Sequence, residues 1–472
     1  MRKSLWLSLL IAALIASLIG CGGNNASNTS SNSTSTTTSS TNTFLTGEDA
    51  PLPAVLGFNL TINSITLTGT GGSTATLLSA PDTVDFARLV GLRQLLAFNS
   101  VPTGTYNAIT FKFSSPVITY LNVSTTPPST ATMNGTWASG VSVDSSGVAT
   151  VTVALKNALT LTTSSLVGLH MHFDMRNSLA VDGVGQITGV VDPKITANAV
   201  TPDDDDAQIT DMRGTIVSVS TTNNNFVIQR WNGKQATISV NSSTTYSDGF
   251  TLSTLVAGMV AEVQGKVQSD GTILASAVQV VAVEHAYIAG PILYVDPNGK
   301  NITILVAENN PAIPGVSQQT PLTLDISTVQ KYSVGGIDNW LTAFAFSQTT
   351  LVVGQRIAIG GALNTNTSPA TFVPARIMLE RQGVDGTLVA NSVTISSGNA
   401  GSFQIQNNGL MGYVLGAPLT VKTSQMTKFI NVNGLSGLQS AGTARLEVRG
   451  LILKDQTTGN PTMYAQWVGL LQ

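Results

Sequence analysis

The chain has 472 residues, only 10% of them charged, and a net charge of −3 at pH 7. This length suggests roughly three or four domains, and 22 Lys and Arg residues spread along it supply no basic face for a nucleic acid. The 44 glycines and 18 prolines punctuate short apolar runs, which is typical of sandwiches and barrels, so the sequence predicts an all-β fold.

Residues 1–21 have the pattern of a secretory signal. Arg2 and Lys3 precede an apolar run, Leu5–Ile19, that is too short and wrongly flanked for a membrane span. The chain's one cysteine, Cys21, stands at the end of this run. A single cysteine cannot form an internal disulfide, so we expect the folded part to depend on packed cores.

The last residues of this segment, Leu18-Ile19-Gly20-Cys21, resemble the lipobox of bacterial lipoproteins. The resemblance implies that the Cys21 sulfur receives a diacylglycerol, that cleavage follows Gly20, and that the new amine is acylated. Buried methylenes contribute roughly 0.8 kcal/mol each, so these acyl chains would anchor the protein stably. Gly22 rather than Asp follows, which by the sorting rule of such lipoproteins favours the outer membrane. The alternative is an ordinary secretory peptide with an incidental free thiol.

Residues 22–48 are rich in Ser, Thr and Asn. Such a segment cannot bury enough apolar surface to fold, so the sequence predicts a flexible tether between the membrane and the first domain. A coil of this length spans about 30 Å, which is enough to lift a domain clear of lipid head groups.

Residues 49–200 are predicted to form a β-sandwich with one short helix. Apolar and polar residues alternate with a period of two in four segments, 56–69, 105–113, 148–155 and 164–175. Between the first two lies the predicted helix over 85–98, because apolar residues recur there at helical spacing. Those residues are Phe86, Leu89, Leu92, Leu95 and Leu96.

Three segments of this region, 84–89, 102–109 and 173–179, resemble a domain of unknown function that is common near the N-termini of bacterial lipoproteins. They contain a Pro-x-Gly-x-Tyr turn that leads into a core strand and a Phe-Asp motif that ends another strand. The resemblance implies a transthyretin-like sandwich and supplies no activity.

His170, His172 and Asp174 alternate with apolar residues on a predicted strand. Strand pleating would place the three polar side chains on one face, where two imidazoles and a carboxylate could ligate zinc or copper. The alternative is that they form the solvent-facing side of a half-buried strand. Same-face neighbours lie about 7 Å apart along a strand, which is long for sharing one ion.

Residues 201–206 contain four consecutive aspartates, Asp203 to Asp206. Adjacent carboxylates repel, so we expect an extended and solvated linker between the sandwich and the rest of the chain. A calcium role is the alternative, but the run lacks the spaced ligands and the turn glycine of a known calcium loop.

The remainder contains a degenerate threefold repeat over 207–283, 284–382 and 383–472, which we name copies one, two and three. Each copy opens with a Gly-led strand, at Gly214, Gly290 and Gly386. Each also has a turn glycine followed by a strand that ends in glycine, over 258–265, 354–361 and 442–450. Five or six short strands with glycines at the bends predict a small OB-like barrel.

The repeat also resembles a second domain of unknown function that recurs in bacterial envelope proteins. The resemblance is best for copy one, weaker for copy two, which carries an insertion over 307–319, and weakest for copy three. Barrels of this type can hold sugars on aromatic platforms, which makes Trp231, Trp340 and Trp467 candidate ligand contacts. The alternative is that each ring packs against a neighbouring barrel or covers a core edge.

The function predicted from these features is that of a non-catalytic lipoprotein scaffold or protein-contact module of the cell envelope. Three histidines, no reactive cysteine and no nucleophile-elbow, phosphate-loop or zinc-protease motif argue against an enzyme, and no cofactor is expected. The expected partners are a membrane, through the covalent lipid, and envelope proteins or glycans. The alternative function is glycan or peptidoglycan binding on the open faces of the barrels.

Overall fold

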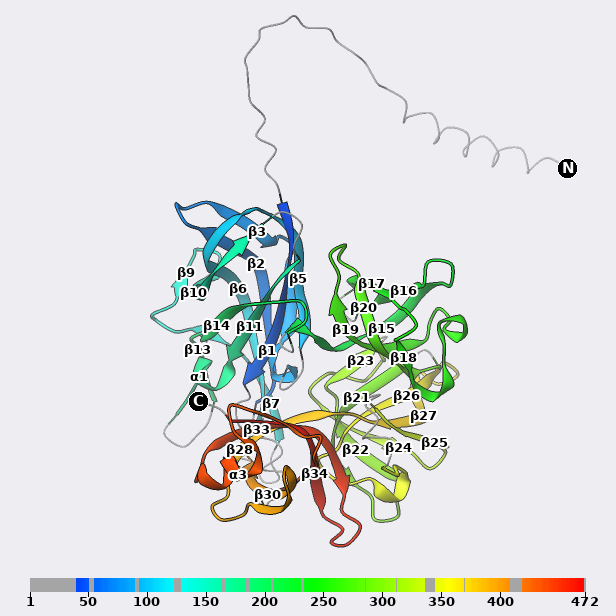
Figure 1. Ribbon diagram of the computed structural model, residues 1–472. Helices are drawn as coiled ribbons and strands as arrows, with labels where there is room; N and C mark the ends of the chain where they lie inside the picture. The colour runs from blue at the N-terminus through cyan, green and yellow to red at the C-terminus, as the bar shows by residue number, and fades with distance from the viewer. Residues whose placement is uncertain are drawn as a thin grey trace, which may run out of the picture. The chain divides into compact units, whose positions relative to one another are not determined.

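The computed structural model describes most of the chain beyond residue 39, and strands account for 62% of the structure against 6% for helices (Figure 1). The prediction of an all-β fold with a short helix is therefore confirmed. No helix among the described residues is both long and apolar enough to cross a membrane. The described ranges are 40–50, 55–89, 93–122, 129–162, 166–182, 187–204, 207–230, 233–284, 286–310, 312–335, 344–368, 370–407 and 418–470.

Residues 40–200 form a sandwich of two main sheets. The first has the order β14-β11-β1-β5 and the second β3-β2-β6-β10-β9, with β4 on β2 and β7 on β6. A small third sheet has the order β12-β13-β8. The bounds are β1 Ser40–Ala50, β2 Val55–Gly69, β3 Thr74–Leu78, β4 Asp82–Asp85, β5 Gln94–Pro102, β6 Gly104–Asn122, β7 Ser129–Asn134, β8 Thr136–Trp137, β9 Ser142–Val143, β10 Ala149–Leu161, β11 Val167–Asp174, β12 Leu179–Val181, β13 Ile187–Val191 and β14 Ile195–Val200.

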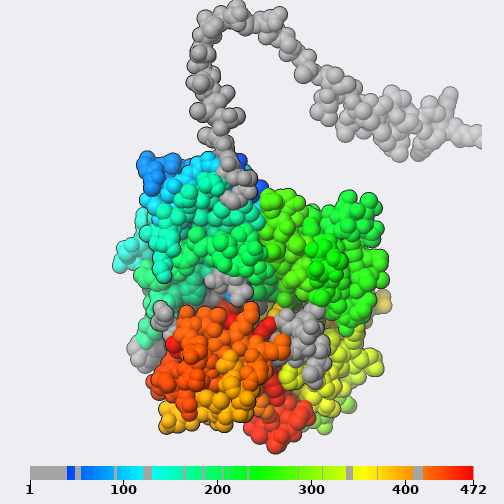
Figure 2. Space-filling view, in the orientation of Figure 1, coloured from blue at the N-terminus to red at the C-terminus, as the bar shows by residue number. Residues whose placement is uncertain are grey.

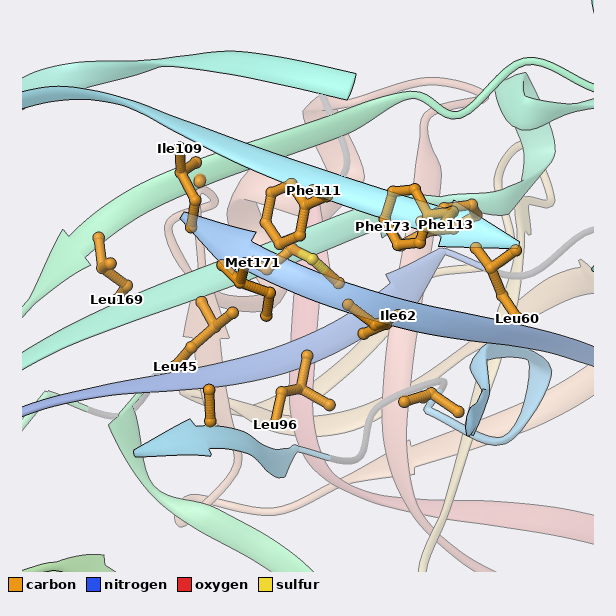
Figure 3. Close-up of a cluster of buried hydrophobic side chains, with 14 of the residues drawn as sticks. Leu45, Leu60, Ile62, Leu96, Ile109, Phe111, Phe113, Leu169, Met171 and Phe173 are labelled. Atoms are coloured by element: carbon orange, nitrogen blue, oxygen red, sulfur yellow. The ribbon is translucent and has the colours of Figure 1, made fainter. Parts of the chain in front are cut away.

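The sandwich core lies between the two main sheets (Figure 3). Apolar residues alternate along β2 and β6, so one face of the second sheet is apolar, and it packs against β1 and β11 of the first. Phe86 stacks on Phe173 with their ring centroids 4.5 Å apart. Other fully buried members include Leu45, Ile62, Phe111, Phe113, Leu169 and Met171.

The predicted tether extends too far, because residues 40–48 belong to strand β1. This strand runs parallel to β11 on one side and antiparallel to β5 on the other. Phe44 and Leu45 are fully buried, and so are the hydroxyl-bearing side chains of Thr43 and Thr46. Only two large apolar residues mark this strand in a polar stretch, and its partner β11 lies far along the chain, so composition alone misplaces the boundary.

The predicted helix over 85–98 is wrong. The described part of this segment consists of a single 3-10 turn, η1 (Phe86–Arg88), and of strand β5, which pairs with β1. Phe86 and Leu96 are buried, but they belong to a turn and to a strand rather than to one helical stripe. The short helix of the sandwich is α1 (Met175–Ser178), where Asp174 accepts a capping hydrogen bond from the Asn177 backbone N–H.

The start of the acidic run is a turn rather than an extended linker. The Thr201 N–H donates to a carboxylate oxygen of Asp204 at 2.6 Å, and Lys266 of copy one pairs with Asp203 at 2.7 Å. These contacts offset the repulsion between adjacent carboxylates, on which the prediction of an extended linker depended. The other two aspartates, at 205 and 206, lie outside the described residues.

Copy one is a closed five-stranded barrel, as predicted. The path β17-β16-β15-β19-β20 is antiparallel, and a parallel pairing of β17 with β20 closes it, while β18 adds to β20. The bounds are β15 Ile209–Ser220, β16 Asn225–Gln229, β17 Gln235–Ser239, β18 Thr245–Tyr246, η3 Ser247–Gly249, η4 Leu252–Thr254, β19 Val260–Val267 and β20 Ile273–Ala282.

Copies two and three repeat this strand order. Copy three closes through the β28–β30 and the parallel β31–β34 pairings, and copy two follows β24-β22-β21-β26-β27-β25 with β23 on β21. The bounds are β21 Ala286–Val295, β22 Asn301–Leu305, β23 Glu308–Asn310, β24 Pro321–Asp325, β25 Lys331–Val334, η5 Gln348–Thr350, β26 Arg356–Asn364, β27 Thr371–Leu379, β28 Gln382–Leu388, β29 Thr394–Ser397, β30 Ala400–Asn407, β31 Leu419–Thr423, β32 Lys428–Ile430, α3 Gly434–Ser440, β33 Arg445–Lys454 and β34 Pro461–Leu470.

The strand-ending glycines of the repeat, Gly265, Gly361 and Gly450, occupy equivalent places. Each lies beside a register shift between the last two strands of its copy. A Cβ at any of them would overlap a backbone carbonyl oxygen of the facing strand. The backbones approach too closely for any other residue at these bends, which explains physically why the glycine pattern recurs.

The sandwich and the barrels share buried contacts, so they are not independent modules joined like beads. Phe44 of β1 belongs to the buried core of copy one. Tyr287 and Met378 of copy two pack with Val260 and Val281 of copy one. Copy three, whose surface is orange and red in Figure 2, packs Leu451 and Leu453 into the core of copy two, with Leu453 only slightly exposed.

Candidate functional site

Six buried charges lie where the sandwich, copy one and copy two meet, and we call them the charge junction. None of their side chains is more than 13% exposed. Three cations face three anions, so the junction is neutral when all six groups are ionised. Its members are Arg88 of η1, Arg213 and Glu262 of copy one, and Glu308, Arg356 and Glu380 of copy two.

Glu308 is the centre of the charge junction. One carboxylate oxygen lies 2.7 Å from the Arg88 Nε and 2.9 Å from an Arg356 Nη. The other accepts a hydrogen bond from the Tyr287 hydroxyl at 2.9 Å and lies 3.3 Å from an Arg213 Nη. One side chain therefore joins all three parts of the fold. Burying charges is costly, and only such complete pairing offsets that cost.

The strand register places the remaining members of the charge junction. Arg213 and Glu262 are opposite each other in the β15–β19 pairing, and they form an ion pair of 2.5 Å. Glu380 directly follows β27 and contacts both Arg213 and Arg356. Burial raises the pKa of the Glu380 carboxyl to about 7, while the two arginines oppose that rise.

A second polar contact joins the sandwich to the copy-two insertion. The Gln319 side chain accepts a hydrogen bond from the Thr119 hydroxyl at 2.6 Å and donates one to an Asp85 carboxylate oxygen at 3.1 Å. Asp85 also accepts from the Phe58 N–H at 2.8 Å. Burial raises the pKa of the Asp85 carboxyl. The insertion that weakens the repeat pattern in copy two therefore has a structural role.

The three metal candidates do not form a metal site among the described residues. His170 is buried, and its Nδ1 lies 3.1 Å from the Thr46 hydroxyl on the neighbouring strand. Asp174 is occupied at the start of α1, where it accepts from the Asn177 backbone and side-chain nitrogens. His172 is partly exposed. No group of three potential metal ligands is found in the described part of the chain.

Of the three candidate tryptophans, the structure describes Trp467, while Trp231 and Trp340 lie outside the described residues, as do Cys21 and Gly20. The Arg449 guanidinium lies over the Trp467 ring, 4.3 Å from its centroid. A Cβ at Gly469 would overlap the same ring. The Trp467 ring thus packs against residues of its own barrel. This agrees more closely with the alternative that the ring is packed in the fold than with a role as a platform for a sugar.

An open groove is lined by copy three and by Phe344 of copy two, and we call it the copy-three groove. Its volume is about 650 Å³. The Phe344 and Tyr464 rings lie in it with centroids 4.8 Å apart, and Met426 is 66% exposed there. The remaining wall mixes small apolar residues and Lys422 with hydroxyl and amide side chains, from Ser396, Ser402, Thr423, Ser424 and Gln425.

The edge of the copy-three groove carries an ion pair. The Lys422 ammonium lies 2.6 Å from an Asp455 carboxylate oxygen and 5.5 Å from the centroid of the Tyr464 ring. This pairing holds the pKa of the Asp455 carboxyl well below its usual range and raises that of the Lys422 ammonium. A ring, a fixed cation and neutral hydroxyls together suit a polar ligand with one flat apolar face.

Sequence reasoning missed the charge junction and the copy-three groove. A usable signal existed for the first, because Glu262 and Glu380 are isolated acids inside or beside apolar strand runs of a chain that is only 10% charged. Isolated charges in such strands need buried partners. The groove gave no comparable signal, since Phe344 and Tyr464 are more than one hundred positions apart and belong to different copies.

Residues 44–188 match a family described as domain of unknown function DUF4382, and residues 213–279 match one described as domain of unknown function DUF5666. The first match covers the sandwich from β1 into β13, and the second covers most of copy one. Both resemblances expected from the sequence are thereby confirmed in these ranges. No curated protein matches the chain in sequence.

Proposed function

We propose that this protein is an exported, non-catalytic lipoprotein that acts as a tethered scaffold or protein-contact module of the cell envelope. In this proposal Cys21 is the lipid attachment site, signal cleavage follows Gly20, and the outer membrane is the destination. The tether is shorter than composition suggests, because residues 40–48 belong to strand β1.

The observation that carries the scaffold proposal is the charge junction. A scaffold must hold its surfaces at fixed separations, and domains of one chain move relative to each other unless their interface is large and hydrophobic. Glu308 pairs with arginines from the sandwich, from copy one and from its own copy, so separating the sandwich or copy one from copy two breaks a buried ion pair. Apolar contacts between copies add to this rigidity.

The anchoring part of the proposal is tested with a Cys21→Ser variant expressed in a lipoprotein-processing bacterium. Wild-type protein is expected in the detergent-rich phase after Triton X-114 partition at the processed mass, and the variant is expected to keep the larger, unprocessed mass, because lipoprotein processing requires the thiol. A Ser30→Ala variant, which removes a hydroxyl from the tether, serves as the matched control and is expected to partition like wild type. Detergent-phase partition of processed Cys21→Ser protein would contradict the proposal.

The contact part of the proposal is tested by chemical cross-linking in intact cells. A scaffold is expected to give reproducible cross-links to other envelope proteins, and Cys21→Ser is expected to lose those that depend on membrane placement. An absence of any heteromeric cross-link in wild-type cells would count against a protein-contact role.

A second function, glycan binding, is favoured by the copy-three groove. The faces through which copies one and two contact each other are buried, so they are closed to a large ligand. The copy-three groove combines the Tyr464 ring with hydroxyl and amide groups, which is the composition of many sugar sites. Its occupant in this proposal is a saccharide such as a segment of peptidoglycan.

Peptidoglycan pull-down tests this second function. Wild-type protein is expected to sediment with peptidoglycan, and Tyr464→Ala to lose most of that binding. Tyr294→Ala, at a ring that is 52% exposed on copy two, is the matched control and should sediment normally. No sedimentation of wild type, or equal loss in both variants, would remove the copy-three groove as a glycan site.

A further inference from the structure

Copies one and two contain an equivalent turn before their last two barrel strands. We call these segments the copy-one turn, residues 251–259, and the copy-two turn, residues 347–355. Each begins with a 3-10 turn, η4 or η5, that is stabilised by a capping box. In each, the N–H of a glycine donates to the carbonyl of an isoleucine in the first strand of the barrel. The distances are 2.8 Å from Gly258 to Ile216 and 2.9 Å from Gly354 to Ile292.

Copy three covers the copy-two turn. The strands β33 and β34 form a hairpin, which we call the copy-three hairpin, and its Lys454 ammonium donates to the Thr349 carbonyl of the turn at 3.3 Å. The Gln355 side chain of the turn donates to the Ile452 carbonyl of the hairpin at 3.2 Å. Val352 of the turn packs against the core of copy three. The copy-two turn is therefore a surface on which one barrel docks another.

The copy-one turn exposes the apolar side chains that the equivalent position in copy two covers. Val256 is 50% exposed, whereas its counterpart Val352 is half-buried. Val217, which follows the isoleucine that the turn contacts, is 42% exposed. Single exposed valines are ordinary on a protein surface, but these two lie on the element that is an interface in the next copy. Repeated modules contact their neighbours through equivalent surfaces, so the copy-one turn has the features of a docking surface.

Copy two exposes the matching partner surface. Its strands β26 and β27 form the copy-two hairpin, which is equivalent to the copy-three hairpin because the strand-ending glycine marks the same bend in both. Next to that bend Leu451 pairs with Tyr464 in copy three, and Leu451 is fully buried in the core of copy two. The equivalent pair in copy two is Ala362 with Val373, and Val373 is 44% exposed. The hairpin face that copy three buries is thus open in copy two.

Both surfaces stay open within one molecule because copies one and two meet elsewhere. Val260 and Val281 of copy one pack with Tyr287 of copy two, and the charge junction adds further contacts. Neither the copy-one turn nor the end of the copy-two hairpin, residues 362–373, contains a charged residue. Two molecules can therefore bring these surfaces together without burying a charge or opposing like charges.

We propose that this protein self-associates, and that the copy-one turn of one molecule docks on the copy-two hairpin of a second copy. The contact repeats between molecules what the copy-two turn and the copy-three hairpin do within one chain. Because each molecule carries both surfaces, the contact can form reciprocally. This inference rests on the proposed protein-contact role and names a second copy of the chain as one partner. Attachment to a shared membrane would raise the local concentration of that partner.

Cysteine cross-linking of the full chain in a non-ionic detergent tests the contact. Val256→Cys protein is mixed with Val373→Cys protein and treated with a flexible bis-maleimide, and peptide mass spectrometry identifies the link. Each molecule carries one introduced thiol, so a link between positions 256 and 373 joins two molecules. Wild type, treated alike, reports any reaction of Cys21. In the matched control, Val181→Cys replaces Val373→Cys, because Val181 is a valine of the sandwich that is 48% exposed.

The link between positions 256 and 373 is expected to form at least about tenfold faster than the link between 256 and 181, because a docked contact raises the local thiol concentration. Equal rates would overturn the proposed pairing of turn and hairpin. A link between two copies of position 256 that forms faster than either would also overturn it, since the copy-one turns would then meet each other.

Sedimentation velocity in a density-matched detergent gives a second readout. Wild type is expected to form species larger than the monomer, in a fraction that rises with concentration. Val256→Lys places a charge in the apolar contact and should raise the apparent dissociation constant by about tenfold or more, whereas Val181→Lys should leave it within about twofold. Both valines are exposed, so both variants should fold.

A wild type that stays monomeric at every concentration, or equal weakening by Val256→Lys and Val181→Lys, would overturn the proposal. If such a monomeric wild type still formed cross-links to other envelope proteins in cells, self-association alone would be removed and the protein-contact role would stand.

Discussion

Replacing Glu308 by Gln is the sharpest test of the charge junction, because it removes one charge and leaves the shape of the side chain. Glu308 contacts Arg88, Arg213 and Arg356 within 3.3 Å, and its side chain is 5% exposed. The variant leaves three buried arginines facing two carboxylates. Removing one partner of a buried ion pair typically costs about 3–5 kcal/mol, so we expect the free energy of unfolding to fall by about that amount.

The assay is urea unfolding of the full chain in a non-ionic detergent at pH 8, followed by tryptophan fluorescence. Lys266→Gln is the matched control, because it removes one partner of the ion pair that joins copy one to Asp203. The Lys266 side chain is 40% exposed and the Asp203 side chain 82% exposed. Exposed pairs contribute about 0–1 kcal/mol, so the control should unfold nearly as wild type does. If Glu308→Gln costs no more than Lys266→Gln, the reasoning that the junction joins the three parts is refuted.

Three further predictions concern Glu380, the contact between Gly57 and Gln319, and the metal candidates. Burial raises the pKa of the Glu380 carboxyl to about 7 from 4.5, so this group contributes about 3 kcal/mol to stability below pH 4.5, and this contribution is lost as the pH rises through 7. The free energy of unfolding should therefore fall less between pH 5 and pH 8 in Glu380→Gln than in wild type. An unchanged pH dependence in the variant would refute this prediction. A Cβ at Gly57 would overlap the Gln319 side chain, so Gly57→Ala should lower the free energy of unfolding by about 1–3 kcal/mol. In a Gln319→Ala background the same substitution should cost less. Equal costs in both backgrounds, measured by thermal unfolding, would contradict the contact. Asp174 caps a helix, so we expect calorimetric titration of wild type with zinc to show no saturable heat at this place. A saturable zinc signal in wild type that His170→Ala abolishes would restore the metal hypothesis.

Local pattern was sufficient for most of the fold. Period-two alternation identified β2, and the recurring glycines identified the barrels, because Gly265, Gly361 and Gly450 occupy bends where no side chain fits. Such features depend on neighbours in sequence or on a repeated backbone constraint. They can therefore be predicted before any long-range contact is known.

Long-range contacts explain what could not be predicted. Strand β1 owes its place to parallel pairing with β11, more than one hundred residues away, and the apolar spacing over 85–98 reflects a turn and a strand that face one core rather than a helix. The charge junction likewise needs Arg88 and Glu308 to meet across two domains. No local window of the sequence contains that information.

The central claim is that a rigid β-structure is attached to a membrane through Cys21, and mass spectrometry of the N-terminal peptide of the mature chain tests it most directly. We predict a peptide that starts at Cys21 and carries the mass of a diacylglyceryl thioether and an N-linked acyl chain. A mature chain that starts elsewhere, or an N-terminal Cys21 with an unmodified thiol and amine, would contradict the claim.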